Sequence, residues 1–286
     1  MTIKTIFLSS LHESLVIICI IFILMILVEF AVLKYKNKII KFTKKNRFLE
    51  YVTSSFFGII PGCVGTFTMD SLYMAGLLSF GGIIAVMIST SGDEAFLLIS
   101  MAIKNIIPWT TLIFLILLLF ILGIIGGFFA DYYKRKTNMK FYEKCEIINH
   151  KNKEFRLPHF LKKHVYGHII KKHIWKIFLW IFIAIFIIGL SEGRINIQFL
   201  GPNMFYILII ASLVALLPIS GPNVFLVVMF SKGLIPFSVL LANSIIQDGH
   251  GLLPIMGFSI SDAIKIKAYN FIFGLILGLI LLGVGL

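Results

Sequence analysis

The sequence predicts an all-α, polytopic membrane protein made of two inverted repeats of about five helical segments each, with broken or re-entrant helices. Composition, charge placement and internal similarity all predict this class. Of the 286 residues, 59% are hydrophobic and 14% are charged, whereas soluble domains average about 45–50% apolar and 25% charged residues. This composition excludes a water-soluble globular fold. The low counts of 8 Pro and 3 Cys exclude collagen-like and disulfide-scaffold classes.

The basic residues predict the orientation of the chain in the membrane. Seven of the 26 Lys and Arg residues lie within residues 34–47, and thirteen more lie within residues 134–176. Both clusters flank long apolar runs, where an excess of Lys and Arg marks the cytoplasmic side and attracts anionic lipid. We therefore expect a multi-pass protein of the bacterial plasma (inner) membrane, with the N-terminus outside and the central basic loop inside. No nucleic-acid-binding motif accompanies the charge, so nucleic acid is not an expected partner.

Each half of the chain predicts the same order of segments. Residues 15–33 form an apolar run that is too long for the core of a signal peptide and lacks a cleavage site, so it predicts a retained span. Two interrupted apolar segments, residues 49–78 and 79–104, follow it, and an uninterrupted run at residues 110–127 closes the half. The corresponding segments of the second half are residues 174–190, 206–232, 236–261 and 267–284. The predicted units are a first membrane repeat at 1–133, a basic cytoplasmic linker at 134–173 and a second, inverted repeat at 174–286.

The repeat rests on a gapless alignment of the two halves. With a shift of 157 residues, Pro61 aligns with Pro218, and "GLLSFGGIIAVMISTSGD" from Gly76 aligns with "GLIPFSVLLANSIIQDGH" from Gly233. The matching Pro and Gly residues are informative because these residues interrupt helices. The first half enters from outside and ends inside, so the second half is expected to run in the opposite orientation. An inverted repeat of this kind is typical of secondary transporters.

The interruptions predict non-helical backbone within the membrane. "PGCVG" and "STSGDE" interrupt the first half, and "PISGP" and "QDGHG" interrupt the second. The arms on either side have about 10–14 residues, which is shorter than the roughly 20 residues of a full crossing. Such backbone is stable only inside protein or beside a water-filled cavity. We expect residues 49–78 and 206–232 to form re-entrant or broken hairpins, and residues 79–104 and 236–261 to form broken crossings. The predicted helix-break residues are Pro61, Gly62, Gly65, Gly92, Pro218, Gly221, Gly249 and Gly251.

Ionisable residues in the apolar segments predict an ion-binding site. Asp93 and Glu94 follow one break, and Asp248 and His250 flank Gly249 at the other. An ionisable group costs about 2.5–3.5 kcal/mol at the centre of a membrane, so it usually faces a cavity and has a function. We predict Asp93, Asp248 and His250 as metal ligands, although such groups also cap the ends of broken helices. The further candidates for substrate or ion binding are Glu94, Gln247, Asn243, Ser220, Asn223, Cys63 and Thr66. Asp70 is interpreted as structural or as lining an aqueous vestibule.

The chemistry of these side chains leaves several ligands open. Carboxylate, imidazole, amide and carbonyl groups together suit a borderline divalent ion such as manganese, iron, cobalt or zinc. The same groups serve protons, since His250 titrates near neutral pH, and glycine-rich helix N-termini also hold oxyanions. The residues by themselves do not choose among these ligands.

The two interrupted regions resemble a known family. "GIIPGCVGTFTMDSLYMAGLLSFGGIIAVMISTSGDEAF" and "LLPISGPNVFLVVMFSKGLIPFSVLLANSIIQDGHGLLP" are similar to the paired signatures of the arsenic-permease-like, ten-span heavy-metal exporters. Bacterial members of that family are labelled manganese transporters. The resemblance covers residues 48–127 and 206–285, and "QDGHGLLP" is its most specific part. The resemblance implies export of a cation. The residues of this chain that match the family's motif positions are Asp93, Glu94, Gln247, Asp248 and His250.

The expected function is therefore secondary transport, with export of a manganese-like divalent metal in exchange for protons by alternating access. No nucleotide-binding P-loop is present, and no cofactor is expected apart from the transported ion. Membrane lipids, the ion and protons are the expected partners, and the glycines from Gly123 to Gly127 allow close helix packing or a homodimer.

Two alternatives stay open. One is a transporter of an anion or a lipid carrier. The other is an intramembrane hydrolase that uses His250 and Asp248 as base and orienting partner, with Ser220 as nucleophile. The hydrolase is disfavoured because no "GxSxG", "HExxH" or basic phosphate clamp accompanies these residues, so the chain is not expected to be an enzyme. The near-absence of Lys and Arg from the apolar segments also argues against a highly charged anion.

Overall fold

The structure is a computed structural model that describes residues 3–43, 46–74, 76–137, 174–191, 204–217, 221–249 and 251–285. Every regular element in these ranges is a helix. The first half contains α1 (Ile3–Thr43), α2 (Arg47–Ile59), α3 (Val64–Met74), α4 (Phe80–Ser89), α5 (Glu94–Ile103) and α6 (Trp109–Thr137). The second half contains α8 (Trp175–Ser191), α10 (Met204–Val214), α11 (Gly221–Ser231), α12 (Phe237–Ile246), α13 (Leu253–Phe258) and α14 (Ile260–Val284). The basic linker predicted at 134–173 lies outside the described residues after Thr137.

The helices are long and apolar enough for a multi-pass membrane protein. Among the described residues, four stretches qualify as spans by length and hydropathy: Ile3–Ile23, Phe80–Ile103, Trp109–Thr137 and Ile260–Val284. The outward faces of α6 and α14 carry large exposed apolar side chains, among them Phe128 and Ile272, which in a bilayer contact lipid. The chain is therefore an all-α polytopic membrane protein, as the composition predicts.

Element boundaries repeat along the chain at the predicted spacing. The bounds of α3 and α4 coincide with those of α11 and α12 after a shift of 157 residues. Contacts between the halves follow the same correspondence. α3 packs on α13 of the second half, and α11, which corresponds to α3, packs on α5 of the first half. The inverted orientation of the halves stays a prediction.

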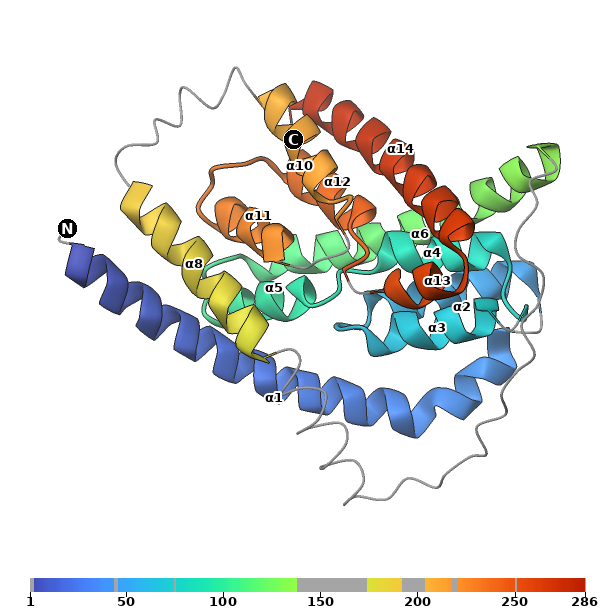
Figure 1. The fold of residues 1–286 in the computed structure, drawn as a ribbon, viewed down its shortest axis with the longest axis horizontal. Coiled ribbons are helices and arrows are strands. Elements are labelled where there is room, and N and C mark those ends of the chain that lie inside the picture. Colours follow the sequence, from blue (N-terminus) through green and yellow to red (C-terminus); the bar gives the residue numbers. More distant parts are fainter. Residues whose placement is uncertain are drawn as a thin grey trace.

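The predicted interruptions are present where the structure describes them. α2 and α3 pack against each other across the turn at residues 60–63. α4 ends at Ser89 and α5 begins at Glu94, and the stretch from Phe80 to Ile103 is almost wholly buried. α1 and α14 run along opposite sides of the helical body, with α4 and α5 between them (Figure 1). The break at "STSGDE" therefore lies in the protein interior. Pro218, Ser220 and His250 lie outside the described residues.

Glycines allow α6 to lie directly against the buried helix α4. A Cβ atom on Gly127 would lie 2.6 Å from the Gly81 carbonyl oxygen, and one on Gly123 would lie 2.7 Å from the Ala85 carbonyl oxygen. In the second half, Gly274 of α14 lies in the same way against Ile246 of α12. These glycines are used for close helix packing within the chain.

Two carboxylates fix the start of α4. Glu50 accepts a hydrogen bond from the Ser79 amide at 2.5 Å, and Asp131 accepts one from the Gly81 amide at 2.7 Å. The Tyr51 hydroxyl donates to the second oxygen of Asp131 at 2.7 Å. Because the first amides of a helix lack intrahelical acceptors and carry partial positive charge, carboxylates at this point stabilise the helix.

Candidate functional site

The two interrupted helical segments, α4–α5 and α12–α13, meet at their breaks. Thr90 ends α4 and Gln247 ends α12 with nearly equal backbone angles, ψ being 131° and 134°. The Gln247 side-chain amide donates a hydrogen bond to the Thr90 carbonyl oxygen at 3.4 Å, although 157 residues separate them. Gly92 and Gly249 then turn the chain with φ of 51° and 52°, a left-handed conformation that glycine adopts without steric cost. The sequence needs glycine at both positions for this reason.

The turn of the first hairpin packs onto this junction. The Gly62 amide donates to the Gly92 carbonyl oxygen at 2.9 Å. The Thr66 and Thr90 hydroxyls lie 3.2 Å apart and share a hydrogen bond. Thr66 also packs against Gly251, beyond the second break. Thr66 therefore connects the first hairpin to both breaks.

A matching contact connects the second hairpin to the first break. Asn223 of α11 interacts with the Glu94 carboxylate at the start of α5. Asn223 and Glu94 occupy the positions that correspond to Thr66 and Gly251 in the repeat. The second helix of each pair, α3 after α2 and α11 after α10, thus contacts the interrupted segment of the other half, and one of these two contacts involves a buried carboxylate.

The second break carries a buried ion pair. Asp248 accepts a hydrogen bond from the Lys267 ammonium at 2.6 Å and another from the Asn270 amide at 3.1 Å. The Lys267 ammonium also donates to the Ile246 carbonyl oxygen at 2.8 Å. Lys267 and Asn270 come from α14 and are almost completely buried. Both oxygens of Asp248 are therefore held by side chains of a helix distant in sequence.

Lys267 corrects the sequence interpretation, which treated the apolar segments as almost free of Lys and Arg. The structure places it two turns inside α14, paired with Asp248. Asn270 is a further site residue that the sequence analysis missed. The signal in the sequence was the i, i+3 spacing of Lys267 and Asn270, which puts both side chains on one face of an apolar helix.

Asp70 also belongs to this region. It is fully buried on α3, and no described residue hydrogen-bonds to either of its carboxylate oxygens. It lies close enough to Asp248 for a Coulomb interaction between the two carboxylates. The structure therefore places Asp70 beside the second break rather than in an exposed vestibule.

The remaining predicted residues are mostly buried near the same junction. Asp93, Glu94, Asn223, Asn243 and Gln247 are all at most 2% exposed. No described residue hydrogen-bonds to the side-chain oxygens of Asn243, Gln247 and Asn270. Cys63 is buried in the first hairpin turn.

Within the described ranges, no three His, Cys, Asp or Glu side chains form a ready metal centre. Because His250 is outside those ranges, the predicted Asp93, Asp248 and His250 ligand set stays a prediction.

We define the polar cluster by its interacting side chains, which converge on the two breaks from four helices and from the connections at the breaks. Its members are Asp70, Asp93, Glu94, Asn223, Gln247, Asp248, Lys267 and Asn270. In the described part of this cluster, the carboxylates outnumber the Lys267 ammonium. Buried charges of one sign require compensating cations or protons, because the interior does not solvate them. The polar cluster is thus suited to hold positive charge.

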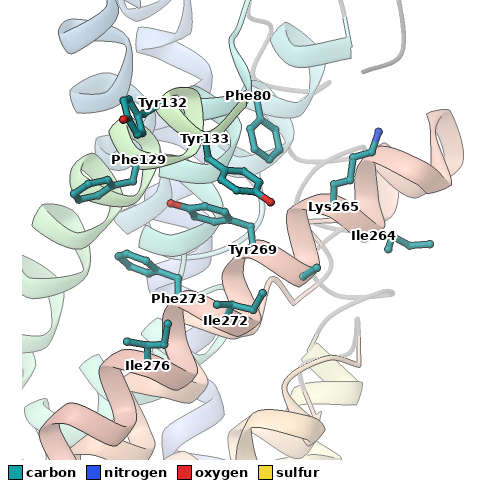
Figure 2. Close-up of a pocket in the computed structure, with 11 residues that line it drawn as sticks. Phe80, Phe129, Tyr132, Tyr133, Ile264, Lys265, Tyr269, Ile272, Phe273 and Ile276 are labelled. Atoms are coloured by element: carbon teal, nitrogen blue, oxygen red, sulfur yellow. The ribbon is translucent and has the colours of Figure 1, made fainter. Parts of the chain in front are cut away.

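A separate cavity of about 550 Å³ lies between α6 and α14, away from the polar cluster. Figure 2 shows Phe129, Tyr133, Tyr269 and Phe273 around it, with Lys265 at one end. Tyr269 and Lys267 lie on different faces of α14, so the helix separates the apolar cavity from the polar cluster. The cavity contains none of the predicted ion ligands.

Comparison with known proteins identifies the family. The family model described as "Putative, 10TM heavy-metal exporter" matches residues 2–200 and 175–283. No curated protein and no solved structure matches the chain. The matched residues span nearly the whole chain, and the description is that of a membrane transporter rather than an enzyme. The chain belongs to this family of ten-span heavy-metal exporters.

Proposed function

We propose that the chain is a secondary transporter that exports a divalent metal cation, manganese-like in its ligand preference, in exchange for protons. The metal would bind at the polar cluster, with Asp93, Asp248 and His250 as its ligands. Alternating access would occur by movement of the two repeats, residues 1–133 and 174–286, about the junction of their breaks. The membrane would be the bacterial inner membrane, with the central basic loop in the cytoplasm.

The observation that carries this proposal is the excess of buried oxygen acceptors over donors. No described residue donates to Asp70, to the Gln247 side-chain oxygen or to the Asn270 side-chain oxygen. A buried polar group without a partner costs about 1–3 kcal/mol, so several such groups near one junction favour a ligand that supplies positive charge. Carboxylate and amide oxygens are ligands for manganese and similar ions. Protons on the carboxylates would replace the metal after its release.

The same contacts favour a cation over an anion. An anion needs donors, and Lys267 is the charged donor of the described part of the polar cluster. Its ammonium already donates to Asp248 and to the Ile246 carbonyl oxygen. An anion would therefore have to compete with a carboxylate at 2.6 Å. A metal ion can instead be bound by the buried oxygen atoms that have no described donor.

Transport in proteoliposomes tests the proposal. We expect the wild-type protein to move Mn²⁺ down its gradient with opposite movement of protons, and Asp248→Asn to abolish both fluxes. Asp131→Asn is the matched control, because Asp131 is also a buried, hydrogen-bonded carboxylate but lies at the start of α4. Equal Mn²⁺ flux in wild type and Asp248→Asn would overturn the site. Flux of phosphate or arsenite without any metal flux would favour the anion alternative.

A further inference from the structure

The Lys267 ammonium has the surroundings of a bound cation. Among the described residues, its two hydrogen-bond acceptors are the Asp248 carboxylate at 2.6 Å and the Ile246 carbonyl oxygen at 2.8 Å. Ile246 is the last residue of α12, and the final carbonyls of a helix carry partial negative charge and lack intrahelical donors. A carboxylate and a free carbonyl at a helix break are also oxygen ligands for metal ions.

The surroundings offer more acceptors than the ammonium uses. Asn270 holds the other oxygen of Asp248, while no described residue donates to its own side-chain oxygen. Asp70 interacts electrostatically with Asp248, and neither of its oxygens has a described donor. An ammonium donates at most three hydrogen bonds, whereas a divalent ion takes about six oxygen ligands. This excess of acceptors fits a site built for a larger coordination number than a lysine needs.

The fold of the break does not require the ion pair. The repeat positions of Asp248, Lys267 and Asn270 in the first half are Ser91, Thr110 and Ile113. The first break nevertheless has the same glycine conformation and nearly the same cap geometry as the second. Buried ion pairs often contribute little net stability because desolvation opposes their attraction. The pair therefore needs an explanation other than formation of the break.

We propose that Lys267 is a tethered competitor of the transported metal: its ammonium occupies the cation position at Asp248, and the metal binds only after Lys267 has moved away. This inference rests on the proposed function. In the described arrangement, the Lys267 ammonium supplies the positive charge beside Asp248. The exchange keeps positive charge at Asp248 in both states, and it lowers the metal affinity by the free energy of displacing Lys267. A lower affinity favours release of the metal on the far side of the membrane.

Metal binding to purified variants tests this role. We expect Lys267→Met to bind Mn²⁺ at least tenfold more tightly than the wild type in calorimetry, because no ammonium competes for Asp248. Lys267→Arg should retain weak binding, since its charge also competes. Lys265→Met is the matched control, because Lys265 lies on the same helix but lines the apolar cavity and pairs with Asp262 (Figure 2). Its affinity should equal that of the wild type.

A second measurement uses the unaltered protein and does not depend on the folding of a variant. Reductive methylation of lysines, followed by mass spectrometry, should label Lys267 faster in the presence of Mn²⁺ than in its absence, while labelling of Lys265 stays constant. Unchanged labelling of Lys267 in a protein that transports Mn²⁺ would overturn the competitor role and leave the proposed function intact. Equal or weaker Mn²⁺ binding by folded Lys267→Met would do the same. Failure of the wild type to bind or transport any divalent metal would instead overturn the proposed function.

Discussion

Gln247 donates a side-chain hydrogen bond to the carbonyl oxygen of Thr90, the residue that occupies its own position in the other half of the chain. Each of the two residues ends a buried helix just before a glycine turn. The bond therefore joins the two breaks to each other.

Removing this bond should weaken the junction. Gln247→Leu keeps the approximate shape of the side chain but has no donor, so we expect the free energy of unfolding to fall by about 1 kcal/mol. Thermal unfolding in detergent measures the change. Ser71→Ala is the control, because the exposed Ser71 hydroxyl bonds only within its own helix to Phe67. Equal stability of Gln247→Leu and wild type would show that the junction does not depend on this bond.

Gly251 should tolerate no side chain. A Cβ atom at this position would lie 2.6 Å from the Thr66 methyl group and 2.9 Å from the Asp248 carbonyl oxygen. We expect Gly251→Ala to lower stability by about 1–3 kcal/mol through overpacking. Addition of Thr66→Ser should restore part of the loss, because serine lacks the methyl group and keeps the hydroxyl.

Gly257→Ala is the matched control for this substitution, since beyond its chain neighbours and its own helix backbone no described atom lies within 4 Å of a Cβ atom there. It should leave stability unchanged or raise it, because alanine favours a helix over glycine. If the double variant Gly251→Ala/Thr66→Ser is no more stable than Gly251→Ala alone, the steric strain does not arise from the Thr66 methyl group.

Asp131 should matter for stability far more than Arg47, although the two lie 3.8 Å apart as an ion pair. Asp131→Ala removes the acceptor for the Gly81 amide and the Tyr51 hydroxyl. Hydrogen bonds to a charged group contribute about 1.5–3 kcal/mol, so a fall of that size is expected in thermal or denaturant unfolding. The Arg47 side chain is 59% exposed, and exposed ion pairs contribute at most about 1 kcal/mol. A larger loss in Arg47→Ala than in Asp131→Ala would contradict this ranking.

Asp70 should contribute to metal binding but not to the stability of the protein when no metal is present. Neither of its oxygens has a described donor, and Asp248 lies nearby. We therefore expect Asp70→Asn to be as stable as the wild type, or more stable, when no metal is present. The wild type should gain about 2.7 kcal/mol at a Mn²⁺ concentration of 100 times its Kd, and the variant should lose most of that gain. Thermal unfolding with and without Mn²⁺ measures both effects. A destabilised variant that keeps the full metal response would make Asp70 a structural residue.

The sequence predicts the helices and their breaks well, and the partners of the site residues poorly. Hydropathy and the aligned glycines locate the interruptions at "STSGDE" and "QDGHG" because these signals are local. The partners of Asp248 come from α14, about 20 residues further along the chain, with separations of 19 and 22 residues. Asp131 and Gly81 are 50 residues apart. Such contacts depend on how helices pack, and no local pattern encodes them.

Lys267 illustrates the difficulty. A lysine near the end of an apolar run matches the pattern of a cytoplasmic flank, and the same pattern also arises when a buried carboxylate from another helix neutralises it. Only the position of Asp248 in space distinguishes the two. Asp70 presented a similar problem, since burial without a donor is visible only after α3 is placed beside the second break.

The start of α4 is held by more side-chain hydrogen bonds than the start of α12. In the first half, the Ser79 side chain caps α4, while Glu50 and Asp131 bind its first amides. The corresponding positions of Ser79 and Glu50 in the second half are Pro236 and Ile207, and Pro236 gives α12 no side-chain cap. In the alternating-access movement that we propose, the first half is therefore expected to be the more firmly held body. The second half, which carries Asp248 and Lys267, is expected to be the part that moves.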